Sequence, residues 1–331
     1  MSSIKINRWI ALTLLLTLLV GSGLAEESTR SEDPAAYWAI FRQNDPKYRN
    51  TSYPYGGRYL IENGCGICSV VNALSASAGL TWADETLADE FLRECLWFLT
   101  EKNKPEQNTF AFNQLADLNA VDAAAYPSVA SVMADYQGNV LYADDKITAA
   151  GIQRLLGEPK SGSHQMLIAA MDRNSGMEVM VETALWLHEH GLDDAMVTLF
   201  AIVAGSESTG APFASKRGHY VDILLRVGEY AETGSFYLLD SFPRSMGVRE
   251  ERRNKVLYET EYYFVEHWRN MTFRKIYEPI RLQPTVIRFQ PREEYLSPLR
   301  ENGTLYDPDA RMKLLERVIT YGMTGIIVSI P

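Results

Sequence analysis

The feature that most constrains this chain is a cysteine placed between two glycines at the start of an apolar segment. Residues 64–74 read Gly-Cys-Gly-Ile-Cys-Ser-Val-Val-Asn-Ala-Leu. The apolar residues recur at helical spacing and predict a core-facing stripe formed by Ile67, Val70, Val71, Leu74 and Ala78. The opposite face is expected to be small and polar, with Cys65, Cys68, Ser69 and Asn72. Cys65 is therefore expected at a helix N-terminus.

This position favours a reactive thiol. The first turn of a helix has backbone N–H groups without helical partners and a partial positive charge. Both features stabilise a thiolate relative to a thiol. The alternative is a buried cysteine that begins an ordinary core helix, but it leaves the glycines on either side of Cys65 unexplained. Cys65 is the candidate nucleophile.

A second informative region begins at His219. It opens an apolar run with the composition of a strand, and a turn-rich stretch at residues 228–234 follows. A second apolar run, residues 236–239, ends at Asp240. The pattern predicts a hairpin that brings His219 and Asp240 to the same end. Of the five histidines, only this one has a glycine before it and an apolar strand after it; the others are His164, His188, His190 and His267.

A cysteine at a helix start, a histidine on a strand and an aspartate that orients the imidazole form the arrangement of cysteine peptidases. Further motifs precede the cysteine: Gln-Asn-Asp-Pro-Lys-Tyr from Gln43, Tyr-Gly-Gly from Tyr55, and Ile-Glu-Asn-Gly-Cys-Gly from Ile61. With these motifs, residues 39–243 resemble a bacterial family of papain-like cysteine peptidases. Its members are secreted relatives of the double-glycine leader peptidases of bacteriocin exporters.

The resemblance implies a fold and a set of roles. The fold is α+β and papain-like, with a helical half that carries the nucleophile helix and packs on an antiparallel sheet. Cys65 is the nucleophile, His219 the general base, Asp240 the orienting acid and Gln43 the side-chain donor of the oxyanion hole. The reaction is hydrolysis of a peptide or amide bond through a thioester, and it needs no cofactor. The chain departs from the family pattern at Ile67, which replaces a proline, and at Cys68, which replaces a threonine.

Three other interpretations are open. Cys65 and Cys68 form a C-x-x-C pair, which is also the pattern of a thioredoxin-like thiol oxidoreductase. A zinc site would need a second ligand pair, for which Cys95 with a distant histidine is poor material. A papain-like domain that has lost its activity and acts as a binding module would keep the fold without the chemistry.

The N-terminus predicts export. Lys5 and Arg8 precede an apolar run at residues 10–20 and a small-residue cleavage site that ends at Ala25, the order of parts in a signal peptide. We expect a signal peptide at residues 1–25, a polar leader at 26–38, a peptidase domain at 39–275, and a C-terminal extension or sheet-completing segment at 276–331. The mature protein is expected to be secreted, without a stable membrane anchor.

The net charge of −10 argues against a nucleic-acid partner, because such binding relies on clustered lysines and arginines. A peptide or cell-wall peptide is the expected substrate.

A capping box at residues 81–84 predicts a helix through Leu99 with Cys95 in its core. Further helices are expected within residues 109–134, 147–156, 177–190 and 309–321, strands at 196–204, 262–265, 285–289 and 325–330, and a cleft-rim loop at 205–217.

Overall fold

The computed structural model describes residues 38–43, 52–53, 58–59, 64–101, 112–143, 146–172, 175–203, 219–241, 258–263, 286–291, 300–301, 304–305 and 322–331. All of them belong to one unit, Tyr37–Pro331. The predicted signal peptide, the predicted helix at residues 309–321 and the predicted loop at residues 205–217 lie outside the described residues. Among the described helices, none combines the length and the apolar character needed to cross a bilayer.

A mixed sheet organises the described residues. Its eight strands lie in the order β3-β4-β12-β5-β6-β7-β9-β8. In that order their bounds are Val140–Ala143, Gln165–Ala170, Gly322–Ile330, Met196–Val203, His219–Arg226, Phe236–Leu239, Val286–Pro291 and Tyr258–Tyr263. Only β3 and β4 pair in parallel, and the other neighbours are antiparallel. The predicted α+β class is confirmed, although the sheet is not wholly antiparallel.

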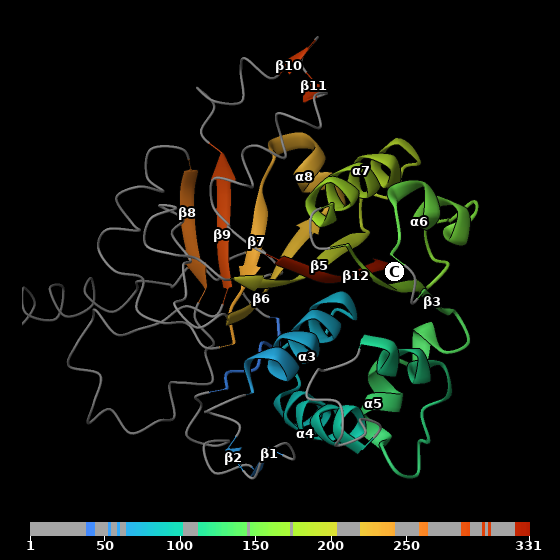
Figure 1. The fold of residues 1–331 in the computed structure, drawn as a ribbon, viewed down its shortest axis with the longest axis vertical. Helices are drawn as coiled ribbons and strands as arrows, with labels where there is room; N and C mark the ends of the chain where they lie inside the picture. Colours follow the sequence, from blue (N-terminus) through green and yellow to red (C-terminus); the bar gives the residue numbers. More distant parts are fainter. Residues whose placement is uncertain are drawn as a thin grey trace, which may run out of the picture. The chain divides into compact units, whose positions relative to one another are not determined.

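Helices cover both faces of this sheet (Figure 1). The helices α3 (Cys65–Ser77), α4 (Glu85–Glu101) and α5 (Pro127–Val132) lie on one side, with the 3₁₀ helices η2 (Phe112–Ala120) and η3 (Ala134–Tyr136). The helices α6 (Ala149–Leu156), α7 (Gly176–Glu189) and α8 (Val227–Thr233) lie on the other. The sequence predicted a helical half packed on an antiparallel sheet. The second layer follows from strands that are apolar on both faces, since both faces must then be covered.

The C-terminal strand shows this two-sided burial. Strand β12 lies between β4 and β5, and Val328 pairs with Leu167 on one side and Val197 on the other. Ile326 and Val328 belong to the core under α7, while Ile327 belongs to the core under α3. The last residues of the chain therefore complete the sheet between strands that come earlier in the sequence.

The prediction of a turn between the two strands is wrong. Residues 228–234 were expected to be a simple turn, but they form most of helix α8 and its C-terminal cap. Val227, Tyr230 and Ala231 are buried at helical spacing and anchor α8 to the sheet. Gly234 ends the helix at φ 71°, a left-handed conformation that glycine adopts without strain. The connection between β6 and β7 is thus a packed helix.

The start of α4 also differs from the prediction. Asp84, rather than Thr81, caps the helix, because its Oδ1 accepts a hydrogen bond of 2.9 Å from the Leu87 N–H. Thr81 instead forms a bridge with Trp38 and accepts a 3.3 Å hydrogen bond from the Ala83 N–H. The predicted helix itself is present, and Cys95 is fully buried in it as expected.

A carboxylate from α4 holds the start of α5. The Ser128 and Val129 N–H groups donate to Glu94 Oε2 at 2.7 and 3.1 Å. These are N–H groups that the first turn of α5 cannot pair within the helix. Glu94 therefore does from a neighbouring helix what an N-cap residue does locally.

We expect Glu94→Ala to lower the free energy of unfolding by about 1–2 kcal/mol, the usual cost of losing an N-cap. The melting temperature should fall by about 2–4 °C. Glu90→Ala is the matched control, since the exposed Glu90 accepts only one long hydrogen bond, 3.4 Å, from Ser128. Equal losses in thermal unfolding of the two variants would contradict this role for Glu94.

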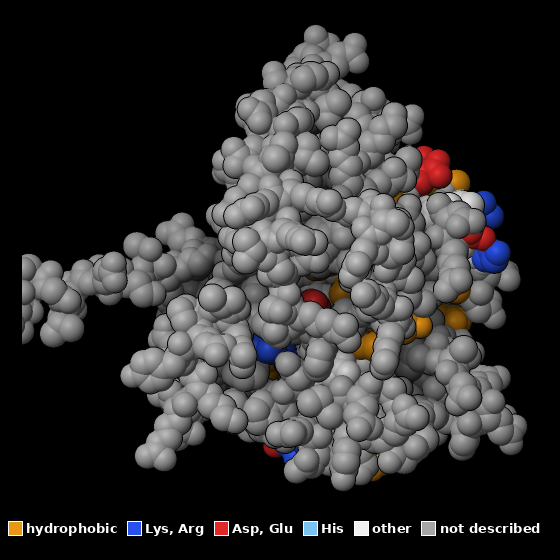
Figure 2. Space-filling model, turned by 60° about the vertical axis from the view of Figure 1, so that its left-hand side comes forward, with side chains coloured by type: hydrophobic (Ala, Val, Ile, Leu, Met, Phe, Trp, Pro, Cys, Tyr) orange, Lys and Arg blue, Asp and Glu red, His pale blue; other side chains and the backbone are white. Residues whose placement is uncertain are grey.

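Charged side chains at the described surface are interspersed by sign. Lys146 pairs with Asp172 at 2.7 Å, and His188 pairs with Asp193 at 2.6 Å. Figure 2 shows acidic and basic described side chains next to one another along one edge of the face in view. The described charges on that edge thus form mixed clusters.

Candidate active site

Cys65 is the first residue of α3, as the sequence predicts. Its side chain is half-buried, and Gly64 precedes the helix as its cap residue. The first turn of α3 contains no acidic residue that would oppose a thiolate. The N–H groups of this turn and the helix dipole both favour negative charge at that end. The position therefore has the electrostatics expected of a nucleophilic cysteine.

Helix α3 is buried on all sides, which the sequence did not predict. Every residue from Gly66 to Ser77 is buried, including those of the polar face. The buried polar side chains each have a partner: Ser69 Oγ donates to Asp222 Oδ1 at 2.8 Å, Ser75 Oγ donates to the Ala39 carbonyl at 2.7 Å, and Ser77 and Thr198 hydroxyls lie 3.2 Å apart. The helix contacts β5, β6, β7 and β12. Its polar face thus fastens it to the sheet and to residues 38–43.

Residues 38–43 run along α3 toward its N-terminus. Asn72 holds this segment with two hydrogen bonds, from the Phe41 N–H to its Oδ1 (2.6 Å) and from its Nδ2 to the Phe41 carbonyl (3.0 Å). Ala39 lies near Ser75 and Phe41 near Asn72, so successive residues of the segment approach the Cys65 end. Gln43 is the next described residue along this path and is only 4% exposed. Its side chain is not on the surface.

Gln43 is joined to the end of β7. Its N–H donates to the Ser241 carbonyl at 2.8 Å. Asp240 precedes Ser241, directly follows β7 and is 9% exposed. The segment held by Asn72 therefore brings Gln43 beside the Asp240 backbone, although the two residues are far apart in the sequence.

The predicted antiparallel pairing of the two strands is present, although α8 and not a turn joins them, and its register is defined. Strand β6 pairs with β7 so that Asp222 lies opposite Leu239 and Ile223 opposite Leu238. One step further in this register, Asp240 comes opposite Val221. Diagonal neighbours in such a pair have Cα atoms about 7–8 Å apart, which is the separation expected for His219 and Asp240. His219 is the first residue of β6 and pairs with Val203; its side chain lies outside the described part of the structure.

The start of β6 lies against the start of α3. A Cβ atom on Gly66 would lie 3.4 Å from a ring carbon of Tyr220, which is a van der Waals contact distance. Tyr220 also stacks on Phe200, with ring centroids 4.9 Å apart. Gly66 therefore lies beside the Tyr220 ring. The residue after Cys65 contacts the residue after His219.

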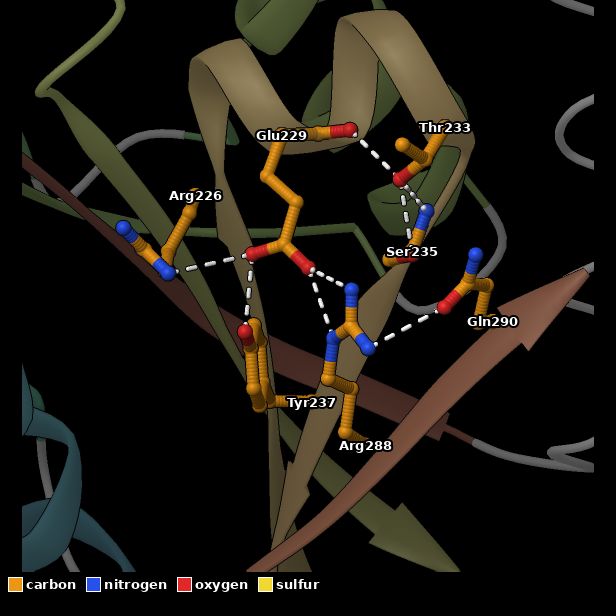
Figure 3. A network of polar contacts seen from close by, with 7 residues as sticks. All are labelled: Arg226, Glu229, Thr233, Ser235, Tyr237, Arg288 and Gln290. Atoms are coloured by element: carbon orange, nitrogen blue, oxygen red, sulfur yellow. Dashed lines mark hydrogen bonds and ion pairs between the residues drawn. The ribbon is translucent and has the colours of Figure 1, made fainter. Parts of the chain in front are cut away.

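A network of polar contacts holds the other end of the hairpin (Figure 3). Glu229 of α8 accepts hydrogen bonds from Tyr237 Oη (2.7 Å), Arg226 Nη1 (3.2 Å) and Arg288 Nε (2.7 Å). These partners come from β7, β6 and β9, so one carboxylate links three strands to α8. Because Glu229 and Arg288 are mostly buried, the network fixes the hairpin that carries His219 and Asp240.

The other two cysteines are core residues. Burial, and secondarily the charge of Cys65, raises the pKa of Cys68 well above its usual value. Burial, with a smaller effect of Glu94, raises the pKa of Cys95 as well. Both side chains are fully buried thiols. A thiol with a raised pKa is a poor nucleophile and a poor metal ligand, so these two positions lend little support to a C-x-x-C redox pair or a zinc site. Among the described residues, no group of three or more His, Cys, Asp and Glu is placed to hold a metal.

In the structure, contacts between residues next to the candidates in the sequence bring together the elements that carry them. Cys65 and His219 begin elements that touch at Gly66 and Tyr220, and Gln43 is bonded to the residue after Asp240. The sequence did not single out Asp222, which is fully buried and bonded to the nucleophile helix. Its signal was a charged residue inside the apolar run of β6.

The two hydrogen bonds between Asn72 and the Phe41 backbone can be tested by substitution. Asn72→Ala leaves the Phe41 N–H and carbonyl groups without their side-chain partner, and we expect a loss of about 2–4 kcal/mol in the free energy of unfolding. The reactivity of Cys65 toward iodoacetamide should also change, because the variant releases the segment that carries Gln43.

Asn119→Ala is the matched control. Asn119 clamps Val140 with the same pair of hydrogen bonds, at the edge strand β3. It should lower stability in urea unfolding while the Cys65 alkylation rate of the folded protein stays unchanged. An alkylation rate that is unaffected in both variants would show that the segment has no part in the site.

Comparison of the chain with known protein families, with curated proteins and with solved structures finds no match.

Proposed function

We propose that this protein is a secreted cysteine peptidase or amidase of the papain-like kind. The observation that carries the proposal is the contact between the starts of α3 and β6, since it brings together the elements that begin with Cys65 and His219. The bond from Gln43 to Ser241 adds the two remaining candidates, Gln43 and Asp240, to the same region. A helix start, a strand start and a hairpin end thus supply a nucleophile, a base and an orienting acid.

The chemistry is acyl transfer. His219 takes the proton of the Cys65 thiol, and the resulting thiolate attacks the carbonyl carbon of the substrate. The Cys65 backbone N–H and the Gln43 side-chain amide stabilise the oxyanion of the tetrahedral intermediate. As the C–N bond breaks, the His219 imidazolium gives its proton to the leaving amine.

Water completes the cycle. His219 takes a proton from a water molecule, which attacks the thioester and releases the carboxylic acid together with the Cys65 thiol. Asp240 orients the imidazole and stabilises its cationic form through both steps. The electrons and protons balance with water as the only co-reactant.

Two further parts of the proposal rest on sequence. The order of basic, apolar and small residues at positions 1–25 supports export of the mature chain. The acidic net charge of −10 favours a peptide or cell-wall peptide as substrate over a nucleic acid.

The test is a hydrolysis screen of the mature protein against a peptide library and soluble cell-wall peptides, in water enriched in ¹⁸O. We expect cleaved products with one ¹⁸O in the new carboxyl group, and no cleavage after Cys65 has been alkylated. A protein that binds peptides from these pools without cleaving any amide would instead be a binding module of the same architecture.

A further inference from the structure

Two thiols lie in the first turn of α3. Cys65 begins the helix and is half-buried, and Cys68 follows three residues later and is fully buried. The Cys68 N–H donates to the Gly64 carbonyl at 2.9 Å, so both cysteines belong to one closed helical turn. The proposed hydrolysis uses only Cys65 and leaves Cys68 without a chemical role.

The separation of the two cysteines is close to that of a disulfide. Residues three apart on a helix are surface neighbours, with Cβ atoms about 5–6 Å apart. A disulfide accepts Cα atoms about 4.4–6.8 Å apart and needs Cβ atoms about 3.5–4.5 Å apart. A bond between the two sulfur atoms therefore requires the Cβ atoms to approach by about 1–2 Å.

The start of α3 can supply this movement. A glycine stands on either side of Cys65, and glycine gives the backbone more freedom than any other residue. The first N–H groups of a helix also have no partner within it, so a small shift of the first residue disturbs few helical hydrogen bonds. The shift is thus confined to the end of the helix.

The charge of Cys65 acts on Cys68. Burial is the larger cause of the raised pKa of Cys68, and the charge of Cys65 is the second. The pKa of Cys95, the other buried thiol, is raised by burial and by Glu94 instead. Of the two buried thiols, Cys68 is therefore the one that responds to Cys65.

We propose that Cys65 and Cys68 form a reversible disulfide, which makes the start of α3 a site of oxidation by low-molecular-weight disulfides. The bond occupies the nucleophile, so the oxidised protein is expected to be inactive. This effect on activity rests on the proposed function, whereas formation of the disulfide does not. Export, as proposed above, would take the protein to an environment in which disulfides persist.

The oxidation consists of two thiol–disulfide exchanges. With oxidised glutathione, the Cys65 thiolate attacks one sulfur, and the first glutathione leaves and takes up the proton that Cys65 had lost. Cys68 then attacks the Cys65 sulfur, and the second glutathione leaves with the proton of Cys68. Two protein thiols are oxidised, and one glutathione disulfide is reduced to two thiols.

The second exchange is expected to be the slower one, because Cys68 stays buried. Cys65 carries no charge in the mixed disulfide, so one of the two causes that raise the pKa of Cys68 is removed. The attack is also intramolecular, which compensates for a small thiolate fraction. A glutathione adduct of Cys65 should therefore appear first and then give way to the disulfide within the helix.

The experiment incubates the reduced mature protein with oxidised glutathione at neutral pH. Samples are stopped over time with N-ethylmaleimide in denaturant, and their intact mass is measured. Wild type should pass from an adduct with one glutathione to a species that has lost two hydrogen atoms and has one thiol left, Cys95. Tandem mass spectrometry should place the bond between Cys65 and Cys68, and dithiothreitol should restore all three thiols.

Two cysteine variants serve as controls. Cys68→Ala has no second thiol in the turn and should stop at the glutathione adduct. Cys95→Ala keeps both thiols of the turn and should oxidise like wild type. If Cys68→Ala does not fold, tandem mass spectrometry of wild type still decides, because it locates the bond without a variant.

The outcomes separate this inference from the proposed function. A folded wild type that stops at the adduct, does not react with glutathione, or bonds Cys65 to Cys95 would overturn the inference, even if the reduced protein cleaves amides. A disulfide that forms in a protein whose reduced state cleaves no amide would support the inference and contradict the peptidase proposal. Cleavage that persists in fully oxidised protein would overturn the effect on activity and the role of Cys65 as nucleophile.

Discussion

Replacing Cys65 with alanine is expected to abolish hydrolysis while the protein stays folded. The substitution removes one sulfur atom from a half-buried helix start, so it should cost little stability. Without the thiol no thioester can form, so turnover should fall to the background rate. The measurement is amide cleavage by the purified variant, with circular dichroism and thermal unfolding as checks of the fold.

Cys68→Ala is the matched variant three residues away. Cys68 is fully buried and its pKa is raised, so it is not expected to supply a thiolate. We expect it to keep most of the activity, with a modest loss of stability from the small cavity. Equal loss of activity in the two variants would point instead to a C-x-x-C pair that acts as a unit.

Gln43→Met is expected to reduce turnover by about 10²–10³, the usual effect of removing one oxyanion-hole donor. Methionine keeps the volume of this buried side chain but has no N–H group to donate. Because the donor acts on the intermediate, kcat should fall while KM changes little.

The melting temperature of Gln43→Met is the control for this interpretation. A stable variant with a strongly reduced kcat supports the donor role. Near-normal turnover in a folded variant would leave the Cys65 backbone N–H as the only donor in the account and would remove Gln43 from the site.

Long periodic segments were predictable because their own composition defines them. Helix α7 and strand β12 match the expected positions, since each has a sustained apolar pattern. Helix α8 was not predictable: it is short and contains a glycine, and burial of Val227, Tyr230 and Ala231 against the sheet stabilises it. Strands β3 and β4 were missed because short apolar runs do not distinguish a strand from a helix segment.

The candidate site also has a part that could be predicted from the sequence and a part that could not. The position of Cys65 at a helix start could be read from the glycines and the apolar stripe beside it. The approach of Gln43 could not, because it depends on hydrogen bonds from Asn72 to a segment 31 residues earlier. The partner of Asp222 was equally hidden, since Ser69 precedes it by 153 residues. Such long-range pairs exist only once the helix has packed on the sheet.

The most direct test of the central claim is the rate of Cys65 alkylation at pH 6 in wild type and in His219→Ala. An ordinary thiol with a pKa of about 8.5 is ionised to only about 0.3% at this pH. A thiolate paired with an imidazolium is largely ionised, and even with its lower intrinsic nucleophilicity it should react about 10-fold faster or more. His188→Ala is the control, because His188 lies at the end of α7 and pairs with Asp193.

The account predicts fast labelling of Cys65 in wild type and in His188→Ala, and slow labelling in a folded His219→Ala. Labelling that is equally slow in all three proteins, or equally fast in all three, would contradict the pairing of Cys65 with His219 and with it the proposed peptidase mechanism.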